Sequence, residues 1–306
     1  MSPVNNPQFF CSLASAAADE QLFGTASRGE VWFLLEYRPH WEAESFAAST
    51  LPAPVKDRIT TYLKTIPGSR LHFIKHQRHT DDYLNLFVVL TGEIEPRIYK
   101  FPLKTYEDLL SLDLYTLAYN PGGFSEHIYH HPIYLTCTHG KHDKCCAKFG
   151  LPVARALGER VGLNAWQASH LGGDRFAANL ACFPHGVYYG RVQPEEVETI
   201  INHDRQGKIY LEKLRGRVCY NFLTQVGDYY LRRETGILEL AAFRYVGNKN
   251  LPEKNRWALQ FQHLATHQTH TVTVQRGPEV VRNYFTCTAL KESNAPQYHL
   301  ISHEVE

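Results

Sequence analysis

The first two thirds of the chain repeat one order of predicted elements. The first copy consists of apolar strand-like runs and two helix-like runs, in the order strand 30–37, helix 54–66, strands 70–76, 84–92 and 96–101, and helix 105–114. The second copy has the same order, with strand 132–137, helix 146–162, strands 164–169, 175–184 and 187–192, and helix 193–204. This pattern favours two similar α/β units.

A strand, a helix, an edge strand, a hairpin and a second helix form the order of a thioredoxin-like α/β layer. We therefore expect an α/β fold with two tandem thioredoxin-like units, at residues 1–118 and 119–206. The remaining third, residues 207–306, differs in character. Its helical spacing over 210–236 and the alternating runs that follow predict a C-terminal helical and β-rich extension with a small antiparallel sheet.

Charge and hydropathy exclude several kinds of partner. The chain has 32 Lys and Arg against 31 Asp and Glu, so it lacks the excess positive charge on which non-specific nucleic-acid or membrane-surface binding depends. No run is long and apolar enough to span a bilayer, and the N-terminal residues lack the pattern of a secretory signal. We expect a cytoplasmic protein with no nucleic-acid or membrane partner.

The loop 137–150, CTHGKHDKCCAKFG, carries three of the seven cysteines. Cytosolic thiols stay reduced, so clustered cysteines there act more often as ligands or catalysts than as disulfides. Cys137 ends a predicted strand, and Cys146 lies near the first turn of the next helix, where the helix dipole stabilises thiolate. This loop is therefore the first candidate for chemistry.

A second loop, SHLGGDRF at 169–176, follows the next predicted strand of the same unit. Gly172 and Gly173 allow a tight turn that brings His170 and Asp174 inward. Two donors from each loop make a four-ligand pattern. Thiolates with imidazole suit zinc or an iron-sulfur centre, and the eight-residue gap between Cys137 and Cys146 is unusual for structural zinc.

The stretches VWFLLEYRPHW, CTHGKHDKCCAKFGLPV and ASHLGGDRFAANLACFPHGVYYGRV, with an early GTA, resemble the sucrase/ferredoxin-like family. The family's members are thioredoxin-fold [2Fe-2S] proteins, and the resemblance implies that Cys137, Cys146 and His170 are cluster ligands. No carboxylate pair supports glycoside hydrolysis. The chain departs from the family pattern at Asp174, where members with two histidine ligands have the second histidine.

Three interpretations of the fourth position follow. Asp174 ligates iron through a carboxylate oxygen, a neighbour takes its place, or the cluster is lost; the neighbours are His139, His142, Cys145 and Cys182. Adjacent side chains on a helix point in different directions, so Cys145 is expected to be a spectator. Cys182 lies on an apolar strand and is expected to be core packing. Three other cysteines have no ligand-type company in the sequence and are expected to be buried small hydrophobes, namely Cys11, Cys219 and Cys287.

The expected function is that of an electron-transfer protein carrying a [2Fe-2S] cluster, an electron carrier more than a stand-alone enzyme. The chain shows no flavin or dinucleotide fingerprint, so its electron donor and acceptor are expected to be proteins. Two alternatives stay open. One is a metal-free thiol-disulfide redox protein using Cys137 and Cys146, and the other is a zinc-stabilised binding module.

Overall fold

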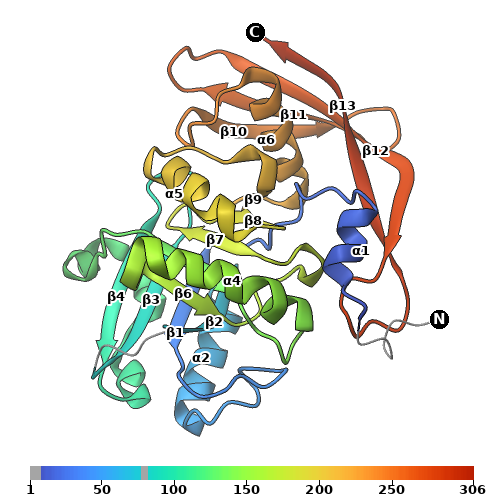
Figure 1. Ribbon diagram of the computed structural model, residues 1–306. Helices are drawn as coiled ribbons and strands as arrows, with labels where there is room; N and C mark the ends of the chain where they lie inside the picture. Colours follow the sequence, from blue (N-terminus) through green and yellow to red (C-terminus); the bar gives the residue numbers. More distant parts are fainter. Residues whose placement is uncertain (1–7, 77–81) are drawn as a thin grey trace.

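The computed structural model describes residues 8–76 and 82–306 and shows a mixed α/β fold built on two sheets (Figure 1). The nine strands of the large sheet are β1 (Val31–Glu36), β2 (Ser69–Lys75), β3 (Leu84–Leu90), β4 (Arg97–Leu103), β5 (Ile133–Cys137), β6 (Ala165–Ala168), β7 (Leu180–Phe183), β8 (Val187–Tyr189) and β9 (Leu214–Arg217). The four strands of the small sheet are β10 (Phe243–Asn250), β11 (Arg256–His263), β12 (Thr269–Asn283) and β13 (Ser293–Val305). The helices are α1 (Cys11–Ala17), α2 (Ala53–Thr65), α3 (Leu114–Tyr119), α4 (Lys144–Val161), α5 (Val197–Arg205) and α6 (Phe222–Thr235).

The repeated order in the sequence corresponds to a repeated strand order in the large sheet. One half has the order β4-β3-β1-β2. The other half has the matching order β8-β7-β5-β6, with β9 added outside β8 as the edge strand. In each half the parallel pair, β1 with β2 or β5 with β6, is connected through one long helix, α2 or α4. The remaining neighbours in each half are antiparallel.

Burial explains the continuous apolar runs of the central strands. All six residues of β1 are buried, because one face packs on α2 and the other lies in a second core. On α2, Val55, Ile59 and Tyr62 follow the i, i+4, i+7 spacing of one helix face, and all three are buried against the sheet.

The two halves of the large sheet join through β2 and β6 and then face each other. The antiparallel register between these strands involves Ile74 with Ala168 and Lys75 with Gln167. Three other strands separate β1 from β7 in the sheet, yet the Trp32 ring on β1 lies only 5.3 Å from the Phe183 ring on β7. This short distance shows that the sheet bends between its two halves. A single apolar core therefore contains side chains from both halves.

Two local predictions differ from the structure. Residues 210–236 were predicted as helical throughout, but Leu214–Arg217 form β9, which pairs with β8 and continues the large sheet past the predicted boundary at residue 206. Arg215 and Arg217 on this strand are buried. Their charges made the segment resemble the polar face of a helix in the sequence, although it is a strand inside the protein. Residues 105–114 form a 3-10 helix, Tyr106–Ser111, instead of one amphipathic α-helix, and α3 begins at Leu114.

The small sheet is antiparallel throughout, and the alternating runs at 256–264 and 270–277 lie in its strands β11 and β12. Helix α6 packs on it through Val226, Tyr230 and Leu231. The long strands β12 and β13 extend from this sheet to the side of α1 (Figure 1). Among the described residues, no helix is both long enough and apolar enough to cross a bilayer.

Candidate metal centre

The cysteine loop lies where the two halves of the sheet meet. Strands β2 and β6 pair only at their carboxyl ends, so the loops that follow β1 and β5 come together there. His139 Nε2 donates to the carbonyl of Glu42 (2.8 Å), and His142 Nδ1 donates to the carbonyl of Ala43 (3.2 Å). The loop after β1 therefore holds the cysteine loop in place.

The ends of β5 and α4 position the two predicted thiolate ligands. Cys137 is the last residue of β5, and Cys146 lies in the first turn of α4. Asp143 caps this helix by accepting from the backbone N–H of Cys145 (2.8 Å). Gly150 lets α4 approach the strand closely, since a Cβ at this position would clash with the carbonyl oxygen of Cys137.

The second loop turns as the two glycines predict. Gly172 and Gly173 have φ of 92° and 80°, and a 3-10 turn, Asp174–Phe176, follows directly. Arg215, fully buried on β9, donates from Nη1 to the carbonyl of Gly172 and to Oδ1 of Asn179, both at 2.8 Å. This arginine fixes the loop, and no local pattern in the sequence marked it for that role.

The structure brings all four predicted site residues together. The ligand atoms of Cys137, Cys146 and His170 lie within 4.8 Å of one another. Cys146 Sγ lies 3.1 Å from Asp174 Oδ1, and His170 Nδ1 lies 2.9 Å from the same oxygen. The sulfurs and the carboxylate are buried, whereas His170 keeps 28% of its side chain exposed.

Electrostatics at this site favour a thiolate beside an imidazolium. The hydrogen bond from Cys146 lowers the pKa of Cys137 well below that of a free thiol, and the same bond raises the pKa of Cys146. Burial alone would lower the pKa of His170, but the neighbouring Asp174 and Cys137 raise it to about 10. A metal ion binds the same thiolate sulfur and imidazole nitrogen that a proton binds, so these atoms can also serve as metal ligands.

The four alternative residues for the fourth ligand position differ in where they lie. His142 lies beside the site, with its ring stacked 3.8 Å from that of His170 and its Nε2 3.8 Å from Asp174 Oδ2. His139 is engaged at both nitrogens, since its Nδ1 accepts from the backbone N–H of His170. Cys182 is core packing, as expected, and Cys145 belongs to a different cluster.

Arg175, which follows Asp174, pairs with Glu20 (2.6 Å). The expectation that Cys11 and Cys287 have no ligand-type neighbours was wrong, because they lie with Asp143 and Cys145 in one buried group. Only the fold reveals this group, since Cys11 and Cys287 come from opposite ends of the sequence.

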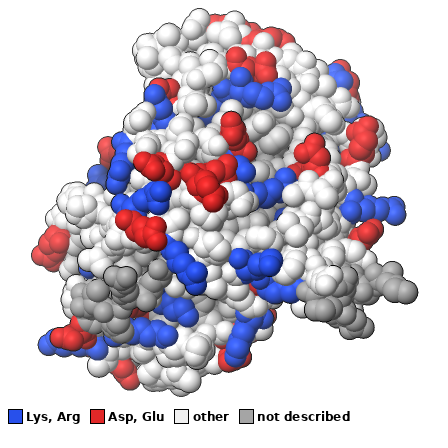
Figure 2. Space-filling model, in the orientation of Figure 1, with Lys and Arg blue, Asp and Glu red and all other residues white. Residues whose placement is uncertain are grey.

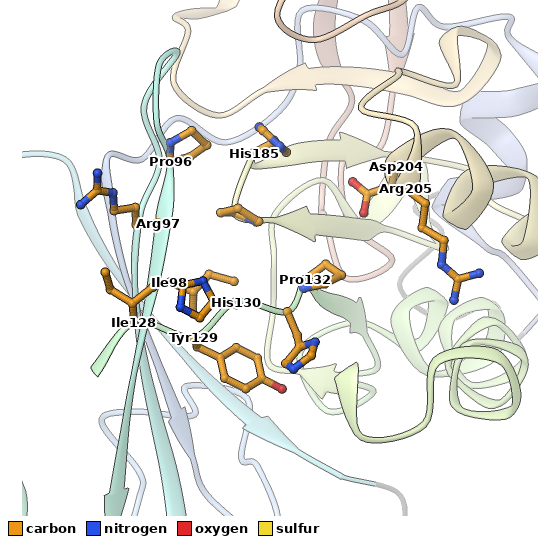
Figure 3. A pocket seen from close by; sticks show the side chains of 12 residues that line it. Pro96, Arg97, Ile98, Ile128, Tyr129, His130, Pro132, His185, Asp204 and Arg205 are labelled. Atoms are coloured by element: carbon orange, nitrogen blue, oxygen red, sulfur yellow. The ribbon is translucent and has the colours of Figure 1, made fainter. Parts of the chain in front are cut away.

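A separate pocket of about 700 Å³ lies away from these residues, between β4, the segment before β5, and α5 (Figure 3). His130 and Tyr129 line its floor, and Asp204 and Arg205 stand across it from Arg97. None of the four predicted ligands lines this pocket, so it is no part of the candidate metal centre.

Two curated relatives match part of the chain. They are the proteins named altered inheritance of mitochondria protein 32 from Meyerozyma guilliermondii, 34% identical over 95 residues, and from Clavispora lusitaniae, 30% identical over 112 residues. These matches cover 28% and 34% of this chain, and 34% and 41% of the respective relatives. The chain thus spans well under half the length of either relative.

Solved structures and family models give two further comparisons. Two cysteine variants of the thioredoxin-like [2Fe-2S] ferredoxin from Aquifex aeolicus align with TM-scores of 0.25 and 0.24 at 18% identity, covering 28% of this chain and 97% of theirs. The model of the sucrase/ferredoxin-like family matches residues 22–216, which include both loops of the candidate metal centre. Because this match extends over more than half of the 306 residues, the chain belongs to the sucrase/ferredoxin-like family.

Proposed function

We propose that the chain is an electron carrier that holds a [2Fe-2S] cluster through Cys137, Cys146, His170 and Asp174. The observation that carries the proposal is the meeting of side chains from two loops. The ligand atoms of Cys137, Cys146 and His170 lie within 4.8 Å of one another, and Asp174 Oδ1 lies 3.1 Å from Cys146 Sγ. The repeated strand order of the two half-sheets further supports tandem thioredoxin-like units, with the ligands confined to the second.

The residues present fit the cluster in type and in bonding. Two buried sulfurs with an imidazole and a carboxylate form a donor set that suits iron. His170 Nδ1 is buried without an aligned hydrogen bond, although it lies 2.9 Å from Asp174 Oδ1. A metal ion bound at this nitrogen would take the place of the proton that faces the Asp174 carboxylate.

A bound [2Fe-2S] cluster would supply one-electron redox chemistry. The chain itself would exclude water from both sulfurs, which are 1% and 0% exposed, and hold the ligand loops through Arg215 and the loop after β1. The edge of His170 faces a hollow of about 430 Å³ lined by Phe46, Leu63, Ser69, Arg70, Leu71 and His72. We place the approach of a protein partner at this hollow, because His170 lines it.

Electron donors and acceptors would have to recognise a surface of mixed charge. Figure 2 shows Lys and Arg interspersed with Asp and Glu on the face it presents, which fits the near-zero net charge. Protein electron partners and a cytoplasmic location are parts of this proposal and stay predictions.

Thiol-disulfide exchange is disfavoured by burial. An attacking thiolate must reach a partner's disulfide, yet the sulfurs of Cys137 and Cys146 are closed off from solvent. The structure therefore favours ligation over exchange at these two residues.

Anaerobic purification of the full chain tests the proposal. We expect about two iron and two acid-labile sulfide per chain, and an electron paramagnetic resonance signal after one-electron reduction. A metal-free protein, or one holding zinc at Cys137 and Cys146, would overturn it.

The identity of the fourth ligand has its own test. With Asp174 as ligand, pulsed electron-nuclear spectroscopy of chain labelled with ¹⁵N-histidine shows one coordinated nitrogen, unchanged in His142→Ala. Two coordinated nitrogens that fall to one in His142→Ala would assign the position to His142.

A further inference from the structure

Three cysteines from distant parts of the chain meet beside the candidate metal centre. Cys11 begins α1, Cys145 lies in the first turn of α4, and Cys287 lies between β12 and β13. Their sulfurs form a triangle with sides of 3.6 Å, 3.3 Å and 3.7 Å. The carboxylate of Asp143 completes the group, with all four ligand atoms within 4.8 Å of one another.

We propose that Cys11, Cys145, Cys287 and Asp143 bind a zinc ion. Zinc holds thiolate sulfurs at about 2.3 Å in a tetrahedron, which separates any two of them by about 3.8 Å. The triangle needs to expand by only a few tenths of an ångström to reach this geometry. A disulfide, with its bond of about 2.05 Å, would need two sulfurs to approach by more than an ångström and would leave the third unpaired.

Hydrogen bonds around the group suit an anionic ligand set. Asp143 Oδ1 accepts from the N–H of Cys145 (2.8 Å), and Oδ2 accepts from the N–H of Cys287 (2.6 Å). The backbone N–H of Cys11 donates to the sulfur of Cys287 (3.4 Å), and the hydroxyl of Ser12 donates to the sulfur of Cys145 (3.4 Å). Each carboxylate oxygen has a second lone pair, so Oδ2 can bind the ion while it keeps its backbone partner.

Burial assigns the site a structural role. Cys11 and Cys145 are 0% exposed, Asp143 is 2% exposed and Cys287 is 6% exposed. Phe9, Phe10 and Phe149 pack around the group. Four protein ligands with no access for water characterise structural zinc, whereas a catalytic site keeps an open position.

The zinc would join three segments that are far apart in sequence. It would fasten α1 and the β12–β13 loop to the start of α4, which carries Cys146. Loss of the ion would therefore release α1 and the β12–β13 loop from the start of α4.

Zinc content of the full chain, purified anaerobically after growth with added zinc, tests this site independently of iron. We expect about one zinc per chain, retained in Cys219→Ser and Cys137→Ser but reduced at least tenfold in Cys11→Ser and Cys287→Ser. Cys219 is the matched control, because it lies in neither cluster. Zinc that is absent from the wild type, or lost in Cys137→Ser and kept in Cys287→Ser, would overturn the proposal.

X-ray absorption at the zinc edge keeps the test independent of whether the variants fold. The wild-type spectrum should fit three sulfurs at about 2.3 Å and one oxygen at about 2.0 Å. A shell with two sulfurs or fewer, or a disulfide among the three cysteines in the anaerobic protein, would contradict the assignment.

Discussion

Cys145 and Cys146 are neighbours in the chain, yet their sulfurs belong to different clusters. Cys146 Sγ lies 3.1 Å from Asp174 Oδ1, whereas Cys145 Sγ lies 3.3 Å from Cys287 Sγ. Successive side chains on a helix diverge by about 100°, so the first turn of α4 presents one sulfur to each side.

The first prediction uses this adjacency. Cys146→Ser should abolish iron and sulfide retention and leave zinc in place, because Cys146 is a ligand only of the proposed cluster. Cys145→Ser should lose zinc and keep most of the iron. Iron, sulfide and zinc measured on the same samples check both statements. Equal loss of iron from the two variants would refute the assignment of Cys146 over Cys145.

Replacing Asp174 by histidine should raise the reduction potential. A carboxylate ligand adds one negative charge that a neutral imidazole does not, and extra negative charge disfavours uptake of an electron. Protein-film voltammetry of wild type and Asp174→His measures the difference, with Cys219→Ser as the control. A potential that does not move would show that Asp174 is not a ligand.

The same substitution should slow loss of the cluster in acid. Carboxylates begin to protonate below about pH 5, which weakens their bond to iron. Bleaching of the visible absorption at pH 4.5 to 5 should therefore be faster in the wild type than in Asp174→His. Equal rates would place the weak point of the site elsewhere.

Gly150→Ala should destabilise the fold and empty the candidate metal centre. The added methyl group would clash with the carbonyl of Cys137 and force α4 away from β5, at a cost of several kcal/mol. Gly123→Ala is the matched control, since a Cβ there meets no atom within 4 Å. Urea unfolding and iron content report the two effects, and equal stability of both variants would contradict the close approach.

His185, in the turn between β7 and β8, should make stability depend on pH. Burial, and secondarily the charge of Arg217, lowers its pKa from 6.5 to about 4. Between these values the unfolded chain binds a proton that the folded chain does not, so the free energy of unfolding falls as pH drops through this window. His185→Asn removes the effect.

From pH 7 to pH 5, the wild type should lose about 1 to 2 kcal/mol more stability than His185→Asn. Urea titrations at both pH values measure this difference. If both proteins lose the same amount of stability, the folded state binds a proton at His185 as readily as the unfolded chain does, which contradicts the prediction.

Local sequence was enough to predict that side chains from two loops would meet at the candidate metal centre, whereas their role as ligands stays a prediction. Each pair lies within one loop, and Gly172 and Gly173 signal the turn that delivers Asp174. The zinc group could not be predicted, because Cys11 and Cys287 come together only through the packing of α1 beside the end of β12. Likewise, β9 was hidden because its buried arginines bond to loop carbonyls that the sequence does not place nearby.

The core shared by the two half-sheets has a consequence for how the protein is made. Trp32, Leu34 and Ile74 lie on a face that is covered by Phe183 and Tyr188 from the second half. A ribosome completes the first half well before these covering residues emerge, so the nascent chain carries an uncovered apolar face during that interval. Chaperone demand should therefore peak while residues 104–188 are being translated and end once β8 can dock.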